Sequence, residues 1–154
     1  ALQFYINIDR RWYRYPIQLN WEKIKYFDVM DFEDDKAIII YLSDGKLKYR
    51  LFFNKDVRFN DTPILYSDSL VSSFALLKES RNIALIDAES CFKVINLNRE
   101  VIFKLNFEKY DIKKDSLKAI DNEYLWLQDI NDKRKCYIIS LKEKTFKIFE
   151  IPFK

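Results

Sequence analysis

Apolar and polar residues alternate along several short stretches of this chain. In residues 2–8 (LQFYINI), every second residue is apolar, and residues 46–52 (KLKYRLF) and 101–107 (VIFKLNF) follow the same pattern. A period of two with one apolar face is typical of a half-buried antiparallel strand. Each of these three stretches is therefore predicted to be a strand with one face toward the core.

Three other runs are apolar on both faces. They are AIIIYL at 37–42, IALI at 83–86 and CYIISL at 136–141. Such runs are typical of central strands that are covered on both sides. Short polar connectors separate the runs, and Asp44-Gly45 is the clearest of them, because this dipeptide favours a two-residue hairpin turn. We expect roughly ten strands joined by hairpin-length loops, and so an all-β fold of antiparallel meander sheets.

Two segments also fit a helical pattern. In residues 69–80 (SLVSSFALLKES), Leu70, Phe74 and Leu77 have helical spacing, and Asp68 or Ser69 is a suitable N-cap. A short helical turn is the alternative near residues 108–116. We therefore expect at most one or two short helices in the all-β fold.

The chain also contains an internal repeat. Residues 94–107 (VINLNREVIFKLNF) align with residues 138–151 (IISLKEKTFKIFEI) at a shift of 44, which places Leu97 on Leu141. Residues 39–52 (IIYLSDGKLKYRLF) follow the same scheme, now at a shift of 55. Upstream of the two later copies, NIALIDA (82–88) and YLWLQDI (124–130) each place an Asp near the end of a strand.

This strand–turn–strand scheme, with an Asp closing one strand, resembles the blades of β-propellers. The resemblance implies repeat units at about 21–55, 70–107 and 117–151 within a single β domain over residues 1–154. Closed propellers have about four or more blades, and the chain holds little more than three such units. Three architectures fit: a part of a larger propeller, a small propeller-like domain, or a β-sandwich whose hairpins repeat.

Composition excludes many kinds of active site. The 154 residues contain no histidine and one glycine, Gly45. Without histidine there is no Ser-His or Cys-His nucleophile pair and no His-bound zinc. One glycine does not make a phosphate-binding loop. Cys91 and Cys136 are too far apart in sequence for a C-x-x-C motif and are interpreted as small buried side chains. We expect no catalytic residues, no metal and no cofactor.

The stretch DRRWYRYP, from Asp9 to Pro16, concentrates arginine and aromatic residues. As a strand it places Arg11 on one face and Trp12 and Arg14 on the other, and Pro16 suits an edge. One interpretation is an amphipathic edge strand with a partner-binding surface. The other is a grip on single-stranded nucleic acid, formed by this group of residues: Arg10, Arg11, Trp12, Arg14, Lys46, Lys48 and Arg50.

The run DFEDD is the acidic counterpart. It contains Asp31, Glu33, Asp34 and Asp35. Its spacing does not match a calcium loop. One interpretation is a solvated connection between strands near 23–30 and 37–42, and the other is a complement to a basic protein partner.

The leading functional hypothesis is a non-catalytic domain that binds a protein through a β-sheet surface. Arginines and exposed aromatic residues are typical of such interfaces. The composition resembles small proteins of AT-rich bacteria, some of which are immunity proteins that neutralise a cognate toxin. Under that reading Arg11, Trp12, Arg14 and the acidic run contact the partner. The alternatives are a single-stranded nucleic-acid-binding module and a fragment of a larger propeller scaffold.

Neither the charge nor any apolar run indicates a membrane partner. The chain carries 27 basic and 24 acidic residues, a net charge of +3, and no apolar run approaches the length of a membrane span. The first residues do not have the pattern of a signal peptide. We expect a cytoplasmic location, with a periplasmic or secreted one as the alternative if an N-terminal segment has been removed.

Overall fold

The computed structural model describes residues 4–8, 10–15, 24–31, 36–53, 64–66 and 68–152, with side chains for residues 10–11, 24–31, 37–49, 64–66 and 68–152. Every helix or strand assigned in these residues is a strand, so the all-β prediction is confirmed. In chain order the strands are β1 (Phe4–Ile8), β2 (Arg11–Tyr15), β3 (Ile24–Asp31), β4 (Lys36–Ser43), β5 (Lys46–Phe53), β6 (Ile64–Tyr66), β7 (Val71–Leu77), β8 (Asn82–Asp87), β9 (Cys91–Ile95), β10 (Val101–Asn106), β11 (Lys118–Ala119), β12 (Tyr124–Gln128), β13 (Lys135–Ser140) and β14 (Thr145–Glu150).

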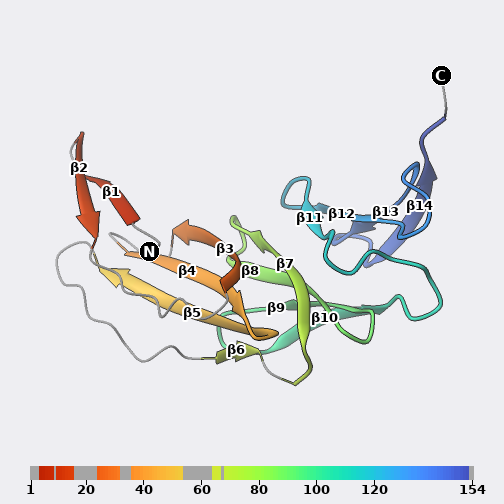
Figure 1. The fold of residues 1–154 in the computed structure, drawn as a ribbon, viewed down its shortest axis with the longest axis horizontal. Helices are drawn as coiled ribbons and strands as arrows, with labels where there is room; N and C mark the ends of the chain where they lie inside the picture. Colours follow the sequence, from red (N-terminus) through yellow and green to blue (C-terminus); the bar gives the residue numbers. More distant parts are fainter. Residues whose placement is uncertain are drawn as a thin grey trace.

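The strands form three four-stranded antiparallel meanders and one hairpin. The first sheet is β3–β6, the middle sheet is β7–β10, the last sheet is β11–β14, and β1 pairs with β2. The sheets follow one another across Figure 1 in chain order, with the hairpin at the end of the first sheet. The leading strands β3, β7 and β11 are in contact from sheet to sheet. The sheets therefore radiate from their first strands, as the blades of a propeller do.

Two apolar layers hold the sheets together. The first lies between the first and middle sheets and includes Ile40, Leu47 and Ile83. The second lies between the middle and last sheets and includes Ile86, Phe92 and Leu127. The middle sheet is therefore covered on both faces, which explains why IALI at 83–86 has no polar face.

The segment with helical spacing at 69–80 contains a strand. β7 is the leading strand of the middle sheet, and apolar layers cover both of its faces. The alternation is lost because Phe74 and Leu76 pack on one side and Leu77 on the other. A register shift between Val71 and Ser73 disturbs the pattern further. Residues 108–116 form turns and one isolated bridge, from Ile112 to Asp129, and no helix.

The repeat alignment of residues 39–52 is one strand out of phase. Residues 94–107 and 138–151 cover the third and fourth strands of their sheets, whereas residues 39–52 cover the second and third strands of the first sheet. All these hairpins have an apolar run, a polar turn and a second run, so the pattern does not distinguish them. The assignment of residues 1–154 to a single domain stays a prediction.

Among the described residues, no helix has the length and apolar character needed to cross a membrane.

Candidate functional site

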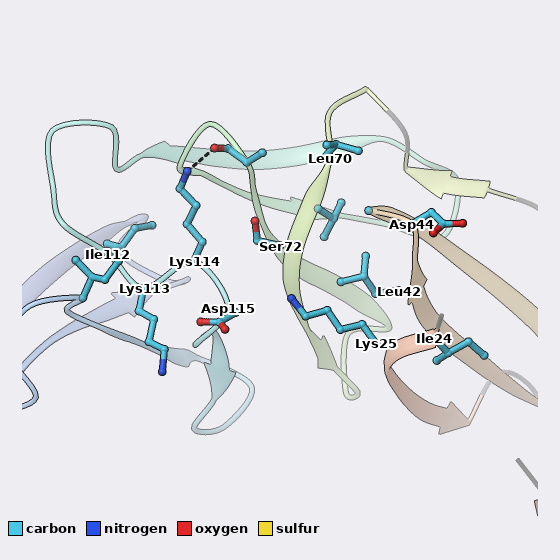
Figure 2. A pocket seen from close by; sticks show the side chains of 14 residues that line it. Ile24, Lys25, Leu42, Asp44, Leu70, Ser72, Ile112, Lys113, Lys114 and Asp115 are labelled. Carbon is cyan, nitrogen blue, oxygen red and sulfur yellow. Dashed lines mark hydrogen bonds between the residues drawn. The ribbon is translucent and has the colours of Figure 1, made fainter. Parts of the chain in front are cut away.

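The loops of all three sheets surround one open depression of about 1060 Å³ (Figure 2). Its lining comes from the start of β3, the β4–β5 turn, the segment entering β7, the β8–β9 turn, the loop before β11 and Ile130 in the turn after β12. These segments are far apart in sequence. They meet because these turns and strand starts lie at the same end of each sheet.

The β4–β5 turn forms one wall of the depression. Asp44 and Gly45 have φ angles of 52° and 73°, the left-handed conformation that a two-residue hairpin turn requires. The amide of Val71 donates to the carbonyl of Gly45 at 2.7 Å, which joins the first sheet to the middle sheet. A Cβ atom on Gly45 would lie 2.7 Å from Cδ2 of Leu70, so this side chain is seated closely on the glycine.

The β8–β9 turn is held by a buried carboxylate. Asp87 is fully buried, and its Oδ1 accepts the amides of Glu89 at 2.9 Å and Cys91 at 3.0 Å. Its Oδ2 accepts the Ser69 hydroxyl at 3.0 Å and forms an ion pair with Lys93 at 3.2 Å. The Lys93 ammonium also donates to the Tyr66 hydroxyl at 2.5 Å. One carboxylate therefore joins the turn to the segment that enters β7.

The turn after β12 is also held by a buried carboxylate, with different hydrogen-bond partners. Asp129 Oδ1 accepts the amides of Asn131 and Asp132, both at 2.9 Å. Its Oδ2 accepts the Tyr137 hydroxyl at 2.8 Å and lies 3.9 Å from the Lys135 ammonium. Both aspartates were placed near strand ends by the sequence, and the structure shows that they hold the turns.

These contacts shift the pKa values of the groups that make them. Burial alone would raise the pKa of Asp87, but the hydrogen bonds from the Cys91 amide, Lys93 and Ser69 outweigh it, so the pKa is lowered. The pKa of Asp129 is lowered in the same way, against burial, chiefly by the Tyr137 hydroxyl. Both carboxylates are therefore anionic at neutral pH and engaged in structure.

The partner groups shift in the opposite direction. Burial and the Asp129 carboxylate raise the pKa of Tyr137. Burial alone would lower the pKa of Lys93, but its bonds to Tyr66 and Asp87 raise it. Lysine and tyrosine are thus held as a cation and a neutral hydroxyl at neutral pH.

Further hydrogen bonds join the loops across the depression. The Lys114 ammonium donates to the carbonyl of Ala88 at 2.5 Å, and the Ser73 hydroxyl donates to the carbonyl of Lys114 at 2.6 Å. The amide of Ile130 donates to the carbonyl of Asp111 at 2.8 Å. The middle and last sheets are fixed to each other here, so the depression is shaped before any ligand arrives.

The accessible surface of the depression is apolar with charges of both signs. Leu70 is 59% exposed and Ile130 is 61% exposed, so two large aliphatic side chains are open to solvent in the lining of one depression. The side chains of Lys25, Lys113 and Asp115 lie around the opening (Figure 2). Such a surface fits a polypeptide better than a small polar molecule.

None of the predicted site residues whose side chains the structure describes lines this depression, and Lys46 alone is next to a lining residue. Arg10 and Arg11 are exposed on the β1–β2 hairpin, and Lys48 is half-buried on β5. Lys46 is exposed and directly follows Gly45 of the β4–β5 turn. The side chains of three predicted residues on strands lie outside the described ones: Trp12, Arg14 and Arg50.

Asp31, the first residue of the acidic run, is at the other end of the first sheet. Asp31 is exposed and ends β3, whose first residues, Ile24 and Lys25, line the depression. The length of the strand separates the two places by roughly 23 Å. Glu33, Asp34 and Asp35 lie outside the described residues. The structure thus does not bring Asp31 to the depression.

Reasoning from the sequence missed Leu70, Ile130 and Lys113. Each is an aliphatic or basic residue in a segment between strands, and nothing in its local pattern marks it. The available signal is positional, because Ile130 directly follows Asp129, one of the two strand-closing aspartates.

Both cysteines are free thiols, Cys136 buried and Cys91 half-buried. Within the part of the chain that the structure describes, no group of three or more Cys, Asp or Glu side chains is arranged to hold a metal ion.

No protein-family model and no curated protein matches this sequence. Solved structures do match the fold. The crystal structure of BBS1N in complex with ARL6DN has a TM-score of 0.60 at 14% identity, and the match covers 84% of this chain and 40% of that one. Kluyveromyces lactis Hsv2p matches with a TM-score of 0.53 at 12% identity, over 96% of this chain and 53% of that one.

The β-propeller domain of Myceliophteria thermophila Cps50 (Swd1) matches with a TM-score of 0.51 at 8% identity, over 75% of this chain and 35% of that one. These neighbours are β-propellers, so the resemblance to propeller blades is confirmed at the level of the fold. The chain spans between 35% and 53% of the length of these structures.

Proposed function

We propose that this chain is a non-catalytic domain that binds a protein partner in the depression between its three sheets. The observation that carries the proposal is the exposure of Leu70 and Ile130 on a concave surface whose loops are already fixed by hydrogen bonds. A preformed surface loses little conformational entropy when it binds, and apolar side chains at its centre supply the driving force.

Size and composition favour a macromolecular ligand. The depression measures about 1060 Å³, while pockets for small molecules are typically about 300–1,000 Å³ and enclose the ligand. Lys25, Lys113 and Asp115 around its opening supply the polar rim of a protein interface.

The titratable groups with shifted pKa values support the absence of catalysis in this proposal. Asp87 and Asp129 are engaged by backbone amides and by neighbouring side chains within the turns. Neither carboxylate is among the residues that line the depression.

The neighbours lend support at the level of precedent. BBS1N, a protein with this fold, was crystallised in complex with ARL6DN. A sequence identity of 14% supports only a similar fold. The binding site proposed for this chain is therefore argued from its own residues.

A pair of matched variants tests the proposal. Ile130→Asp alters the depression, and Ile120→Asp alters an isoleucine at the opposite end of β12; the two side chains are 61% and 57% exposed. The tagged chain and both variants are used to copurify proteins from native lysate, with quantitative mass spectrometry. We expect a partner retained by the chain and by Ile120→Asp and lost at least tenfold with Ile130→Asp. Equal recovery with both variants would contradict the site.

A separate form of the proposal, which uses a surface outside the depression, is an immunity protein that neutralises a basic toxin in the cytoplasm. Asp31 is exposed, and it begins the acidic run that also holds Glu33, Asp34 and Asp35. Arg11, Trp12 and Arg14 would extend the contact. Replacing the four acids by lysine should weaken the complex with the copurified partner, measured by titration calorimetry, whereas unchanged affinity would remove this form.

The exposed arginines of the hairpin keep nucleic acid as a second candidate. Arg10 and Arg11 are exposed, and so is Lys46. A single-stranded oligonucleotide should then quench Trp12 fluorescence with an affinity that falls steeply with salt. No quench at low salt would exclude this function. The scaffold alternative, a part of a larger propeller, is supported by the coverage of the neighbours, at 35% to 53%.

A further inference from the structure

β6, β10 and β14 are the fourth strands of their sheets, so each has one side along which no described strand pairs. An unpaired side of this kind, here called an outer edge, presents backbone amides and carbonyls to another extended chain. Proteins commonly protect such edges by keeping them short, by bending them with a bulge or by placing polar and charged side chains along them. The three outer edges differ in these features.

The outer edges of β6 and β10 are protected. β6 is three residues long, and its pairing with β5 contains a register shift. β10 has a register shift near its start. The amide of Phe107 donates to the carbonyl of Ser90 at 2.8 Å, so the alternation of the ladder directs the backbone groups of Lys104 and Asn106 outward. Both residues are exposed and polar, so an approaching strand would meet a bulge, an ammonium and an amide.

β14 is regular along its whole length. All six of its residues pair with β13 without a register shift, and the amide of Ile151 continues the ladder by donating to the carbonyl of Arg134 at 2.7 Å. Because backbone groups alternate in direction, the amides and carbonyls of Phe146, Ile148 and Glu150 point away from β13. The first two of these residues are apolar, in contrast to the outward-directed residues of β10.

The exposure of this edge comes from its place in the sheet. Phe146 and Ile148 are on the face that packs against the middle sheet, because they pair with Ile139 and Tyr137 of that face. Phe146 reaches the apolar layer, whereas Ile148 is 44% exposed. Lys104, which has the equivalent position in β10, is exposed although another sheet follows its own. An outer edge therefore stays open whether or not a further sheet comes after it.

We infer that the outer edge of β14 binds an extended segment of a partner protein, which adds a strand to the last sheet. The segment pairs antiparallel, as β13 does, with apolar side chains opposite Phe146 and Ile148. Between them it has an acidic residue opposite Lys147, which is exposed and has no ion pair among the described residues. The backbone ladder supplies affinity, and the alternate side chains supply specificity.

The position of Lys147 argues against a second copy on this edge. Residues that face each other across an antiparallel ladder direct their backbone groups either both toward each other or both away. In a pair of β14 strands, Lys147 could therefore face only Thr145, Phe149 or the other Lys147. The acid of the strand, Glu150, has the opposite backbone direction. A second copy leaves the lysine without an anion, whereas a partner segment supplies one.

A short fluorescein-labelled peptide is the probe. It has valine at alternate positions, aspartate at the middle position and threonine at the others. The residues opposite Ile148 direct their amides toward β14, so the valine amides must be free. The probe therefore carries N-methyl groups on aspartate and threonine, which also prevents peptides from pairing with one another, and the control peptide carries them on the valines. Fluorescence anisotropy should rise with the concentration of the chain for the probe and stay constant for the control.

Two proline variants at equivalent positions locate the contact. Ile148→Pro and Lys104→Pro each remove an amide that points outward, so the pairing with β13 or β9 is kept. Ile148→Pro should raise the dissociation constant of the probe at least tenfold, and Lys104→Pro should leave it unchanged. Circular dichroism and thermal melting establish that each variant is folded.

A charge exchange tests the side chains without changing the backbone. Lys147→Glu should weaken binding of the probe and strengthen binding of the same peptide with lysine in place of aspartate. Lys104→Glu in β10 is the control and should change neither.

Four results would overturn the inference. The absence of binding at millimolar probe, or equal binding of the two N-methylated peptides, means that no ladder forms. A folded Ile148→Pro variant that binds like the wild type places the peptide elsewhere. A wild-type chain that forms dimers, with Ile148→Pro monomeric, assigns the edge to a second copy. Ile130→Asp should bind the probe normally, since the depression is a separate surface, so failure here leaves the proposed function untouched.

Discussion

Asp87 of the middle sheet and Asp129 of the last sheet occupy the same position and are held in different ways. Each follows or ends a second strand, and each accepts two backbone amides of the turn that follows. The third strand then supplies Lys93 to Asp87 and Tyr137 to Asp129. These two residues are equivalent by register, because they pair with Leu85 and Leu127.

The comparison separates what the turn requires from what varies. The amides of the turn need an acceptor, and a carboxylate provides it in both sheets. The neighbour on the third strand only has to donate, so an ammonium and a hydroxyl both serve. The corresponding turn of the first sheet is built without a buried carboxylate. Asp44-Gly45 makes a two-residue turn with both φ angles positive, and Asp44 is exposed.

The largest effect is expected from Asp87→Asn. The change leaves the Lys93 ammonium, whose side chain is only 18% exposed, without its anion. Breaking a buried pair from one side typically costs about 3–5 kcal/mol. The free energy of unfolding, measured with urea, should fall by about that amount.

Asp129→Asn is the matched control for that change. Asn keeps one oxygen to accept the two amides of the turn, and its NH2 group then faces the neutral Tyr137 hydroxyl, to which it can donate, while Lys135 is 3.9 Å away and partly exposed. We expect a loss of about 1–3 kcal/mol. If the two variants lose the same stability, the charge of Lys93 does not distinguish the sites.

An effect smaller than that of Asp87→Asn is expected from Tyr137→Phe. The change removes the hydroxyl that Asp129 accepts and keeps the ring, which packs against Phe107 and Tyr110. A hydrogen bond to a charged group contributes about 1.5–3 kcal/mol. Tyr110→Phe, in an exposed tyrosine of the same aromatic cluster, is the control and should change stability little. Comparable losses in the two variants would mean that the hydroxyl of Tyr137 contributes nothing specific.

Acid should act on both sheets in the same direction. The pKa values of Asp87 and Asp129 are lowered by folding, so their contribution is present above the unfolded value of about 3.9 and is lost as the pH falls through the folded pKa. Only part of this stabilisation is lost within the first pH unit below the pKa of the unfolded state. Urea midpoints from about pH 6 to about pH 2.5 should fall less in the Asp87→Asn and Asp129→Asn double variant than in the wild type. An equally steep fall would assign the acid sensitivity to other carboxylates.

At high pH, stability depends on the groups that donate to the two aspartates, Lys93 and Tyr137. The pKa values of Lys93 and Tyr137 are raised by folding, so their contribution is complete below the unfolded values and is lost as the pH rises through the folded ones.

Asp87 and Asp129 also show which features of the structure could be predicted from the sequence. The alternation of short apolar runs predicted the strands, and the Asp at the end of IALID and of LWLQD marked the turns that it holds. The donors Lys93 and Tyr137 were not predicted, because which third-strand residue lies beside the Asp depends on register and on turn length. β7 was ambiguous because a strand with two buried faces has no period of two.

The depression was out of reach for a similar reason. Leu70 and Ile130 are 60 positions apart in sequence, and only the stacking of the sheets brings them to one opening. The basic and acidic stretches, from Arg10 to Arg14 and from Asp31 to Asp35, stand out in the sequence, yet these are clusters along the chain, whereas the depression is a cluster in space.

The smallest effect is expected at the turn that has no carboxylate cap. Gly45→Ala places a Cβ at φ +73°, 2.7 Å from Leu70 Cδ2. A left-handed conformation costs an L-residue about 1–2 kcal/mol, and the Leu70 side chain, which is exposed, is free to move away. Urea unfolding should therefore show a loss near the lower end of that range. Gly45→Asn separates the two causes, because Asn tolerates the conformation but keeps the Cβ. If Gly45→Asn is as stable as the wild type, the backbone angle causes the loss in Gly45→Ala. If stability returns only when Leu70→Ala is added to Gly45→Ala, the cause is the contact between the new Cβ and Leu70, which shapes the wall of the depression.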